Sequence, residues 1–338
     1  MHNKTIFRLL FILLIFFAKV PFAYNDDTSE FVATDTSEFK EIKSTDVQPF
    51  VKAANDSCAG CPNQNSGILP WVLLSLGITA VAGIMVRFKS TRNLRGLFLL
   101  VSMLIFGFYR GACPCPISSF EDVFLLISGV NISWQNLIWF LGLIPLTYIF
   151  GKVWCGWVCH LGALQEFLFL PGRINWLQSI KTQRILRWCR MILLFALVLQ
   201  LILTKTNIFC QFDPFKVAFN LVSPNWIGWV LLGLLLLTSL FIYRPFCRTI
   251  CPIGLVLGWI SKIPGASVIG WKNDCKKCSQ CSKCCKIHAI IDSNENSSID
   301  NKECIACGNC MDSCKTNSIS FLRKNRSLIT TIFPKRIG

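Results

Sequence analysis

The sequence is poor in charged residues, and those it has are mostly basic. Asp, Glu, Lys and Arg make up 15% of the 338 residues, with 18 acidic against 34 basic side chains. A soluble domain carries about a quarter charged residues. The shortage of charge argues against a soluble protein and favours membrane-spanning helices. A basic balance is then expected in cytoplasmic loops, so it does not indicate nucleic-acid binding.

The sequence also lacks a glycine-rich nucleotide-binding motif and any side-chain grouping typical of hydrolytic enzymes. It is therefore better described as a subunit or accessory protein than as a stand-alone enzyme of those classes. Cysteine, in contrast, is abundant at 19 residues, most of them in three groups along the chain. A single redox compartment does not explain all of them.

The chain divides by composition into five parts. Residues 1–23 have a basic start and an apolar core, which predicts a signal peptide or anchor. Residues 24–66 are acidic and polar, as expected of a flexible periplasmic segment. Residues 67–270 form the predicted transmembrane domain, 271–322 a polar cysteine-rich domain, and 323–338 a basic tail.

Uncharged apolar runs predict about five transmembrane helices. A charge at the centre of a span costs about 2.5–3.5 kcal/mol, so its repeated absence is informative. The runs cover residues 68–86, 96–109, 134–151, 191–204 and 226–243.

The loops between these runs predict their orientation. Four basic residues lie in loop 87–95 and six in 152–190, whereas 111–133 has no Lys or Arg. The positive-inside rule places the basic loops and everything after residue 243 in the cytoplasm. We therefore expect a multi-pass protein of the bacterial inner (cytoplasmic) membrane.

Two similar motifs follow apolar runs. "WCGWVCHLG" at 154–162 and "FCRTICPIG" at 246–254 share C-x3-C spacing and a glycine three residues later. They are 92 residues apart, which indicates an internal repeat. Residues i and i+4 share a helix face, so each pair could point at one site. Four converging thiolates would suit a further iron–sulfur cluster, copper(I) or zinc; a thiol–disulfide couple and simple packing are the alternatives. The four thiols are Cys155, Cys159, Cys247 and Cys251.

The polar C-terminal domain carries C-x2-C-x2-C-x3-C twice. This is the bacterial two-cluster ferredoxin pattern, in which the fourth cysteine of each run ligates the other cluster. Four-cysteine zinc sites are the alternative, because C-x2-C is also zinc spacing. The expected set for the first [4Fe-4S] cluster is Cys275, Cys278, Cys281 and Cys314, and for the second Cys304, Cys307, Cys310 and Cys285. The usual proline after each fourth cysteine is replaced by Lys286 or Lys315, and Cys284 offers an alternative fourth ligand.

The predicted fold class is therefore an α-helical polytopic membrane protein with a small α+β C-terminal two-cluster ferredoxin domain. With its two C-x3-C motifs, the chain resembles the NapH/NosR-type membrane polyferredoxins over about residues 68–320. "CRTICPIG" matches the family motif, "FDPF" at 212–215 also looks family-like, and His160 replaces the usual proline in the first copy. The 24–66 segment has no room for a large outer flavin domain, so the chain looks closer to the compact NapH type.

This resemblance implies a function and partners. It implies an electron-transfer protein that passes electrons between two cytoplasmic clusters, the membrane-edge thiols and a quinone or a respiratory partner protein, periplasmic or in the membrane. A related branch of the family implies the alternative, an assembly factor or metal reductase that reduces copper or disulfides for a respiratory enzyme.

Five cysteines are expected on the outer, oxidising side. Disulfide stapling is the simpler interpretation, and copper capture or electron exit is the alternative. These cysteines are Cys58, Cys61, Cys113, Cys115 and Cys210. Arg110 and Glu166 are candidates for quinone or proton handling, although a snorkelling Arg and a solvated Glu are the commoner roles. His160 is a candidate ligand or proton carrier, although an interfacial histidine with a satisfied hydrogen bond is the commoner role. Trp154 and Trp157 are expected to anchor their helix at the interface.

Overall fold

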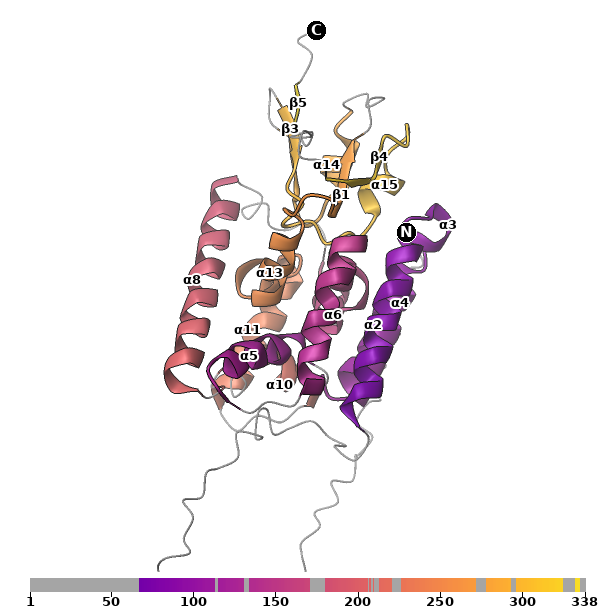
Figure 1. Cartoon of the computed structure of the whole chain (residues 1–338). Helices are drawn as coiled ribbons and strands as arrows, with labels where there is room; N and C mark the ends of the chain where they lie inside the picture. Colours follow the sequence, from indigo (N-terminus) through magenta and orange to yellow (C-terminus); the bar gives the residue numbers. More distant parts are fainter. Residues whose placement is uncertain are drawn as a thin grey trace, which may run out of the picture. The chain divides into compact units, whose positions relative to one another are not determined.

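A computed structural model describes most of the chain after residue 66 (Figure 1). The predicted signal peptide or anchor, the predicted periplasmic segment and most of the basic tail lie outside the described residues. The described ranges are 67–112, 115–130, 134–170, 180–205, 207, 209, 213–220, 226–271, 278–292, 296–324 and 332–334.

The described part of the chain before residue 261 is mostly helical. Its α-helices are α2 (Ile68–Met85), α3 (Lys89–Arg92), α4 (Arg95–Ser102), α5 (Pro116–Ile127), α6 (Trp134–Phe150), α7 (His160–Leu168), α8 (Ile180–Thr204), α10 (Pro214–Asn220), α11 (Trp226–Phe241), α12 (Pro245–Thr249) and α13 (Pro252–Ile260). Two π-helical turns, η2 (Met103–Tyr109) and η3 (Trp154–Val158), interrupt it.

All five apolar runs are helical. Ile68–Met85 and Thr182–Thr204 are each long and apolar enough to cross a membrane. The other three, Arg95–Tyr109, Leu137–Phe150 and Trp226–Phe241, are shorter apolar helices. The chain is thus mostly helical with two candidate spans, and the number of five spans stays a prediction.

Small residues let α2 and α6 pack closely. A side chain at Gly83 would put its Cβ 2.4 Å from Cγ of Phe150, and one at Gly142 would lie 2.6 Å from Cδ1 of Leu76. Small residues at helix contacts allow the backbones to approach, which is how helices associate without a hydrophobic driving force in lipid. This pair forms the most extensive helix contact in the described structure.

Two short helices lie at the end of the bundle away from the strands, α5 and α10 (Figure 1). Each begins with a proline, Pro116 or Pro214. Proline suits the first helical position because its missing N–H would have no partner there. Each short helix is followed by an apolar helix (α6 or α11), a C-x3-C turn and a nine-residue helix (α7 or α13).

The C-terminal part of the chain contains both strands and short helices, and its first strand begins four residues before the predicted boundary at residue 271. Strand β1 (Ser267–Trp271) pairs antiparallel with β4 (Ile319–Arg323), with Ser267 opposite Arg323. A second antiparallel sheet has the order β2-β3-β5. The remaining elements are β2 (Ile290–Asp292), β3 (Asn296–Ile299), β5 (Ile332–Pro334) and the short helices α14 (Gln280–Cys284) and α15 (Asn309–Asp312). Strand β1 also contacts α6, so the domain is packed against the helical part.

The contact between α2 and α6 leads to a first prediction. Gly83→Ala should lower the thermal unfolding temperature in detergent, because overpacking costs about 1–3 kcal/mol. That exceeds the gain of about 0.5–1 kcal/mol from replacing glycine within a helix. Gly77→Ala is the matched control on the same helix, since nothing lies within 4 Å of its added Cβ. Equal unfolding temperatures for the two variants would contradict the packing argument.

Candidate redox site

The four C-x3-C thiols line one cavity of about 40 Å³. One water needs about 10–15 Å³ of such volume, so the space exceeds a single water site. The structure therefore brings the two predicted pairs together, although 92 residues separate them in sequence. The wall includes Cys155, Cys159, Cys247 and Cys251.

The two motifs have matching backbone geometry. Cys159 caps α7 with φ −57° and ψ 111°, and Cys251 caps α13 with φ −54° and ψ 110°. Each Sγ atom accepts a hydrogen bond of 3.4 Å from the N–H of the glycine three residues later, Gly162 or Gly254. This explains the conserved spacing between the two copies: the second cysteine of each motif ends one turn and begins the next helix.

The i, i+4 argument predicted that the two cysteines of a pair share one helix face. The structure differs, because a turn lies between them. Cys155 lies in the π-helical turn η3 and Cys159 at the break before α7. Cys247 lies in α12, and Cys251 at the break before α13. The thiols converge because the chain turns between the two cysteines of each pair. π-Helical turns often occur at functional sites.

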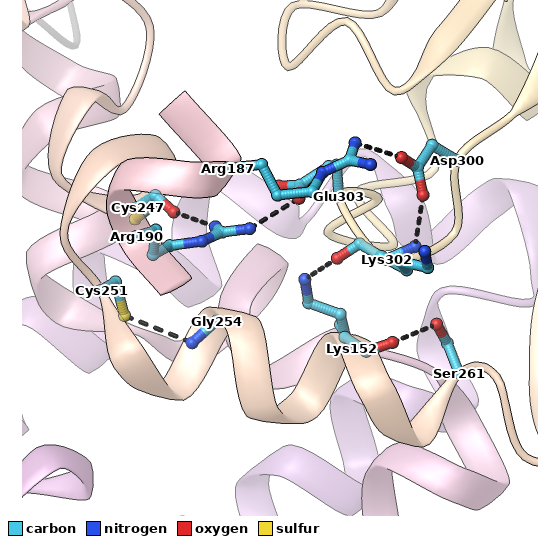
Figure 2. A network of polar contacts seen from close by, with 11 residues as sticks. Lys152, Arg187, Arg190, Cys247, Cys251, Gly254, Ser261, Asp300, Lys302 and Glu303 are labelled. Atoms are coloured by element: carbon cyan, nitrogen blue, oxygen red, sulfur yellow. Dashed lines mark hydrogen bonds and ion pairs between the residues drawn. The ribbon is translucent and has the colours of Figure 1, made fainter. Parts of the chain in front are cut away.

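Basic side chains dominate the polar part of the cavity wall. Lys152, Arg190 and Arg248 line it and are only 4%, 2% and 6% exposed. One carboxylate, that of Glu303, is found among the described lining residues. Nη1 of Arg190 donates to the carbonyl oxygen of Cys247 at 2.9 Å, and its Nη2 donates to Glu303 at 2.6 Å (Figure 2).

A second buried charge network holds the first C-x3-C turn. Arg95 donates two hydrogen bonds to the carboxylate of Glu166, at 2.8 and 2.6 Å, and Arg244 donates one at 2.7 Å. The same arginines donate to backbone carbonyls, Arg95 to Gly156 at 3.0 Å and Arg244 to Cys155. The expectation of a solvated Glu166 is therefore wrong, because two arginines distant in sequence enclose it.

The second predicted ferredoxin set is gathered near this cavity. Cys285, Cys304 and Cys307 pack against a hydrophobic cluster that Cys155 also contacts. Cys310, the fourth cysteine of this ferredoxin set, is buried. The hydrophobic cluster consists of Tyr243, Ile287, Ala289 and Ile305.

The first predicted set lies nearer to solvent. Cys278 is exposed, Cys281 and Cys314 are half-buried, and Cys275 lies outside the described residues. The Cys284 thiol donates to the carbonyl of Cys281 at 3.2 Å. No group of three or more Cys, His, Asp or Glu side chains in the described part of the chain has the geometry of a metal site, so the ligand sets stay proposals.

Burial controls the ionisation of two cysteines of the second set. It raises the pKa of Cys304 to about 12 and that of Cys285 to about 11, and neighbouring Cys307 adds to both shifts. Metal binding must therefore release protons from these thiols. Burial alone would raise the pKa of Glu303, but Arg190, Lys152 and Arg187 outweigh it and lower that pKa. Glu303 is consequently a charged partner for Arg190 at neutral pH.

Several other predicted residues have surroundings that differ from the expectation. His160 is fully buried between Phe215 and Phe219, and neither ring nitrogen has a hydrogen-bond partner among the described residues. The indoles of Trp154 and Trp157 are also buried, so they do not anchor the helix at an interface. Lipid-facing and core tryptophans have the same sequence signature, which explains the error.

Two predicted outer-side residues are buried as well. The guanidinium of Arg110 lies 4.6 Å from the ring centre of Trp71 and is 4% exposed, so it does not snorkel. Cys115 is a buried free thiol, and the choice between disulfide stapling and metal capture stays a prediction. The other outer cysteines, Cys58, Cys61, Cys113 and Cys210, lie outside the described residues.

Comparison with known proteins agrees with the cysteine motifs. A family described as a 4Fe-4S binding domain matches residues 132–178 and again 224–269. The two matches begin 92 residues apart, as the C-x3-C motifs do. A second family, also described as a 4Fe-4S binding domain, matches residues 298–320. No solved structure shows a significant match to the chain.

Three relatives are informative. An uncharacterized protein of Methanocaldococcus jannaschii is 30% identical over 235 residues, which cover 68% of this chain and 94% of the relative. Protein NirI of Paracoccus denitrificans is 25% identical over 63% of this chain and 33% of its own length. Regulatory protein NosR of Pseudomonas aeruginosa is 28% identical over 45% of this chain and 22% of its own length. The chain thus spans a third or less of these two longer relatives.

The repeated thiol motif, the cysteine-rich domain and these matches define a 4Fe-4S binding protein. Iron–sulfur domains transfer electrons, which supports that general function here. The chain belongs to the NapH/NosR-type family of membrane polyferredoxins.

The network around Glu166 leads to a second prediction. Glu166→Gln should destabilise the protein by about 3–5 kcal/mol, because it leaves two buried arginines without their carboxylate. Thermal and denaturant unfolding would measure the loss. Asp312→Asn is the control: its carboxylate bonds Arg92 at 2.6 Å, but its side chain is 36% exposed. Arg92 itself is 7% exposed, but water reaches Asp312, so we expect a smaller loss than for Glu166→Gln; equal losses from the two variants would contradict this assignment.

Proposed function

We propose that the protein passes electrons across the membrane edge, between cytoplasmic [4Fe-4S] clusters and a quinone or a periplasmic respiratory partner. The four C-x3-C thiols would hold a third redox centre between the two. The ferredoxin sets would be Cys275, Cys278, Cys281 and Cys314 for one cluster, and Cys304, Cys307, Cys310 and Cys285 for the other.

The observation that carries this proposal is the charge of the thiol cavity. Its described lining residues include three buried cations and one carboxylate. With three cations and one carboxylate, the described wall carries a net positive charge, which favours a negatively charged occupant. Four thiolates around a metal or an iron–sulfur cluster would supply negative charge, whereas a neutral disulfide pair or packed thiols would not. The cavity therefore fits an anionic, metal-containing centre better than the alternatives.

The surrounding residues fit a role in holding such a centre. Arg95, Arg244 and Arg190 bind carbonyl oxygens within the two C-x3-C turns, which fixes the backbone that presents the thiols. Apolar side chains such as Phe215, Phe246 and Ile305 complete the cavity wall and exclude water. An iron–sulfur cluster bound there would supply one-electron redox chemistry, and the protein would supply ligation, position and electrostatics.

Exposed apolar side chains support placement in a membrane. On α8, Ile192, Phe195 and Leu203 are 62%, 70% and 73% exposed. Similar apolar side chains are exposed on α11. Large contiguous apolar surfaces of this kind indicate contact with lipid or another protein. Together with the basic loops, they favour a multi-pass inner-membrane protein whose ferredoxin domain is cytoplasmic.

Metal analysis of the purified full-length protein tests the third centre. We expect about twelve iron atoms per chain with matching acid-labile sulfide, since each cubane cluster holds about four. Cys155→Ser combined with Cys247→Ser should remove about a third of the iron. Cys189→Ser is the control, because Cys189 is exposed and lies outside every proposed site. About eight iron atoms, unchanged in the double variant, would contradict a third iron–sulfur centre, and zinc without sulfide would contradict all three.

Reporter fusions test the orientation. A reporter active only outside the cytoplasm should be active when inserted at Gly129, between α5 and α6, and inactive when fused after Gly338. A reporter that fluoresces in the cytoplasm should give the reverse pattern. The same activity at both positions would contradict the proposed topology.

A further inference from the structure

The membrane-edge thiol site and the second ferredoxin set share a wall. Ile305 and Glu303 line the thiol cavity, and both belong to the segment that carries Cys304 and Cys307. The hydrophobic cluster that contains Ile305 packs against Cys155 and also against Cys285, Cys304 and Cys307. Thiols of both sets therefore contact the same small hydrophobic cluster.

Two glycines allow this close approach. A Cβ at Gly156, within the first C-x3-C turn, would lie 2.1 Å from the carbonyl oxygen of Ile305. A Cβ at Gly258 on α13 would lie 2.7 Å from the carbonyl oxygen of Lys302. Both clashes are with backbone atoms, which cannot move aside as a flexible side chain can. Any larger residue at these positions must push the ferredoxin segment away from the thiol site.

Directional hydrogen bonds hold the same contact. The indole of Trp157 donates to the carbonyl of Ala306 at 3.2 Å. The ammonium group of Lys152 donates to the carbonyl of Lys302 at 2.5 Å. The guanidinium of Arg190 joins the Cys247 carbonyl to the Glu303 carboxylate (Figure 2). Arg190 lies on α8, Trp157 in η3 and Lys152 in the short loop before η3, so two distant parts of the chain hold the contact.

The first ferredoxin set has no such contact among its described members. Neither Cys278 nor Cys281 nor Cys314 lines the thiol cavity or packs on the shared hydrophobic cluster. Cys278 is exposed, and the thiol of Cys314 lies 3.5 Å from the hydroxyl of Thr316, also at the surface. The described members of the two ferredoxin sets therefore differ in their relation to the membrane-edge thiols.

From this asymmetry we propose that segment Glu303–Cys307 is the contact through which electrons pass between the membrane-edge site and the ferredoxin domain, and that Arg190 is its positioning residue. The second ferredoxin set would thus exchange electrons with the membrane-edge thiols directly, and the first set only through the second. This inference rests on the proposed function. One electron leaves one centre and enters the other in this step, and no bond to the protein forms or breaks.

Low-temperature electron paramagnetic resonance of the full-length protein in nanodiscs, reduced stepwise with dithionite, tests the order of the sites. Reduced centres that are close together broaden or split one another's signals. We expect Cys304→Ser to abolish the interaction with the membrane-edge centre, and Cys278→Ser to preserve it. Loss of the interaction in Cys278→Ser with retention in Cys304→Ser would overturn the proposal.

A second pair of variants tests the positioning role. Arg190→Gln should weaken the magnetic interaction and slow reduction of the membrane-edge centre while the iron content stays at the wild-type level. Arg187→Gln is the matched control on the same helix: Arg187 also pairs with Glu303, at 3.4 Å, and with Asp300 at 2.5 Å, but contacts neither C-x3-C turn in any hydrogen bond of the described structure. Identical spectra for the two variants would overturn the role of Arg190.

Gly156→Ala keeps the proposal testable if Cys304→Ser or Arg190→Gln fails to fold. It should weaken the interaction, whereas Gly96→Ala should not, because nothing lies within 4 Å of its added Cβ. A wild-type interaction in Gly156→Ala would overturn the contact. If iron analysis finds only two clusters, both the third centre of the proposed function and the present inference are contradicted. If it finds three and the third interacts with the first set alone, only the present inference fails.

Discussion

Buried arginines hold both C-x3-C turns by their backbone carbonyls, and the rest of the site depends on these contacts. Arg95 and Arg244 bind the first turn and share Glu166, while Arg190 binds the second turn and pairs with Glu303. Each guanidinium thus connects a turn to a carboxylate elsewhere in the chain. Because a buried charge is costly without its partner, these connections leave the turns little freedom to move apart.

The same contacts explain how an internal repeat produces one site. Each repeat supplies only two thiols, too few for a metal centre that needs four ligands. The two copies present their second cysteine identically, as the cap of a nine-residue helix with a glycine N–H bonded to sulfur. The carboxylates that pair with the arginines differ, however. The partner at the second C-x3-C turn, Glu303, belongs to the ferredoxin domain, whereas the partner at the first turn, Glu166, belongs to α7. The repeat is therefore symmetric around the thiols and asymmetric where the ferredoxin domain docks.

Much of this organisation could be predicted from local patterns. Apolar runs predicted the helices, and the cysteine spacing predicted 4Fe-4S binding and the repeated motif, because those signals depend on residues close together in the chain. The buried environment of Glu166 could not be predicted in this way. Its partners lie 71 and 78 residues away, and an isolated glutamate has the same sequence signature whether it is solvated or enclosed. Lys152 and Arg244 are 92 residues apart, the same offset as the two C-x3-C motifs. This signal could have drawn attention to these two basic residues.

The sequence by itself determined the chemistry: soft thiol ligands in repeated spacings, apolar helices with little charge, and a surplus of basic residues. These follow from residue type and short-range periodicity. Only the tertiary structure decided which groups meet. It placed four thiols and three cations around one cavity, and it brought Ile305 against Gly156, 149 positions earlier in the chain. Such contacts depend on which helix faces pack together, and that choice is made by the whole chain at once because every buried charge and close backbone approach must be satisfied together.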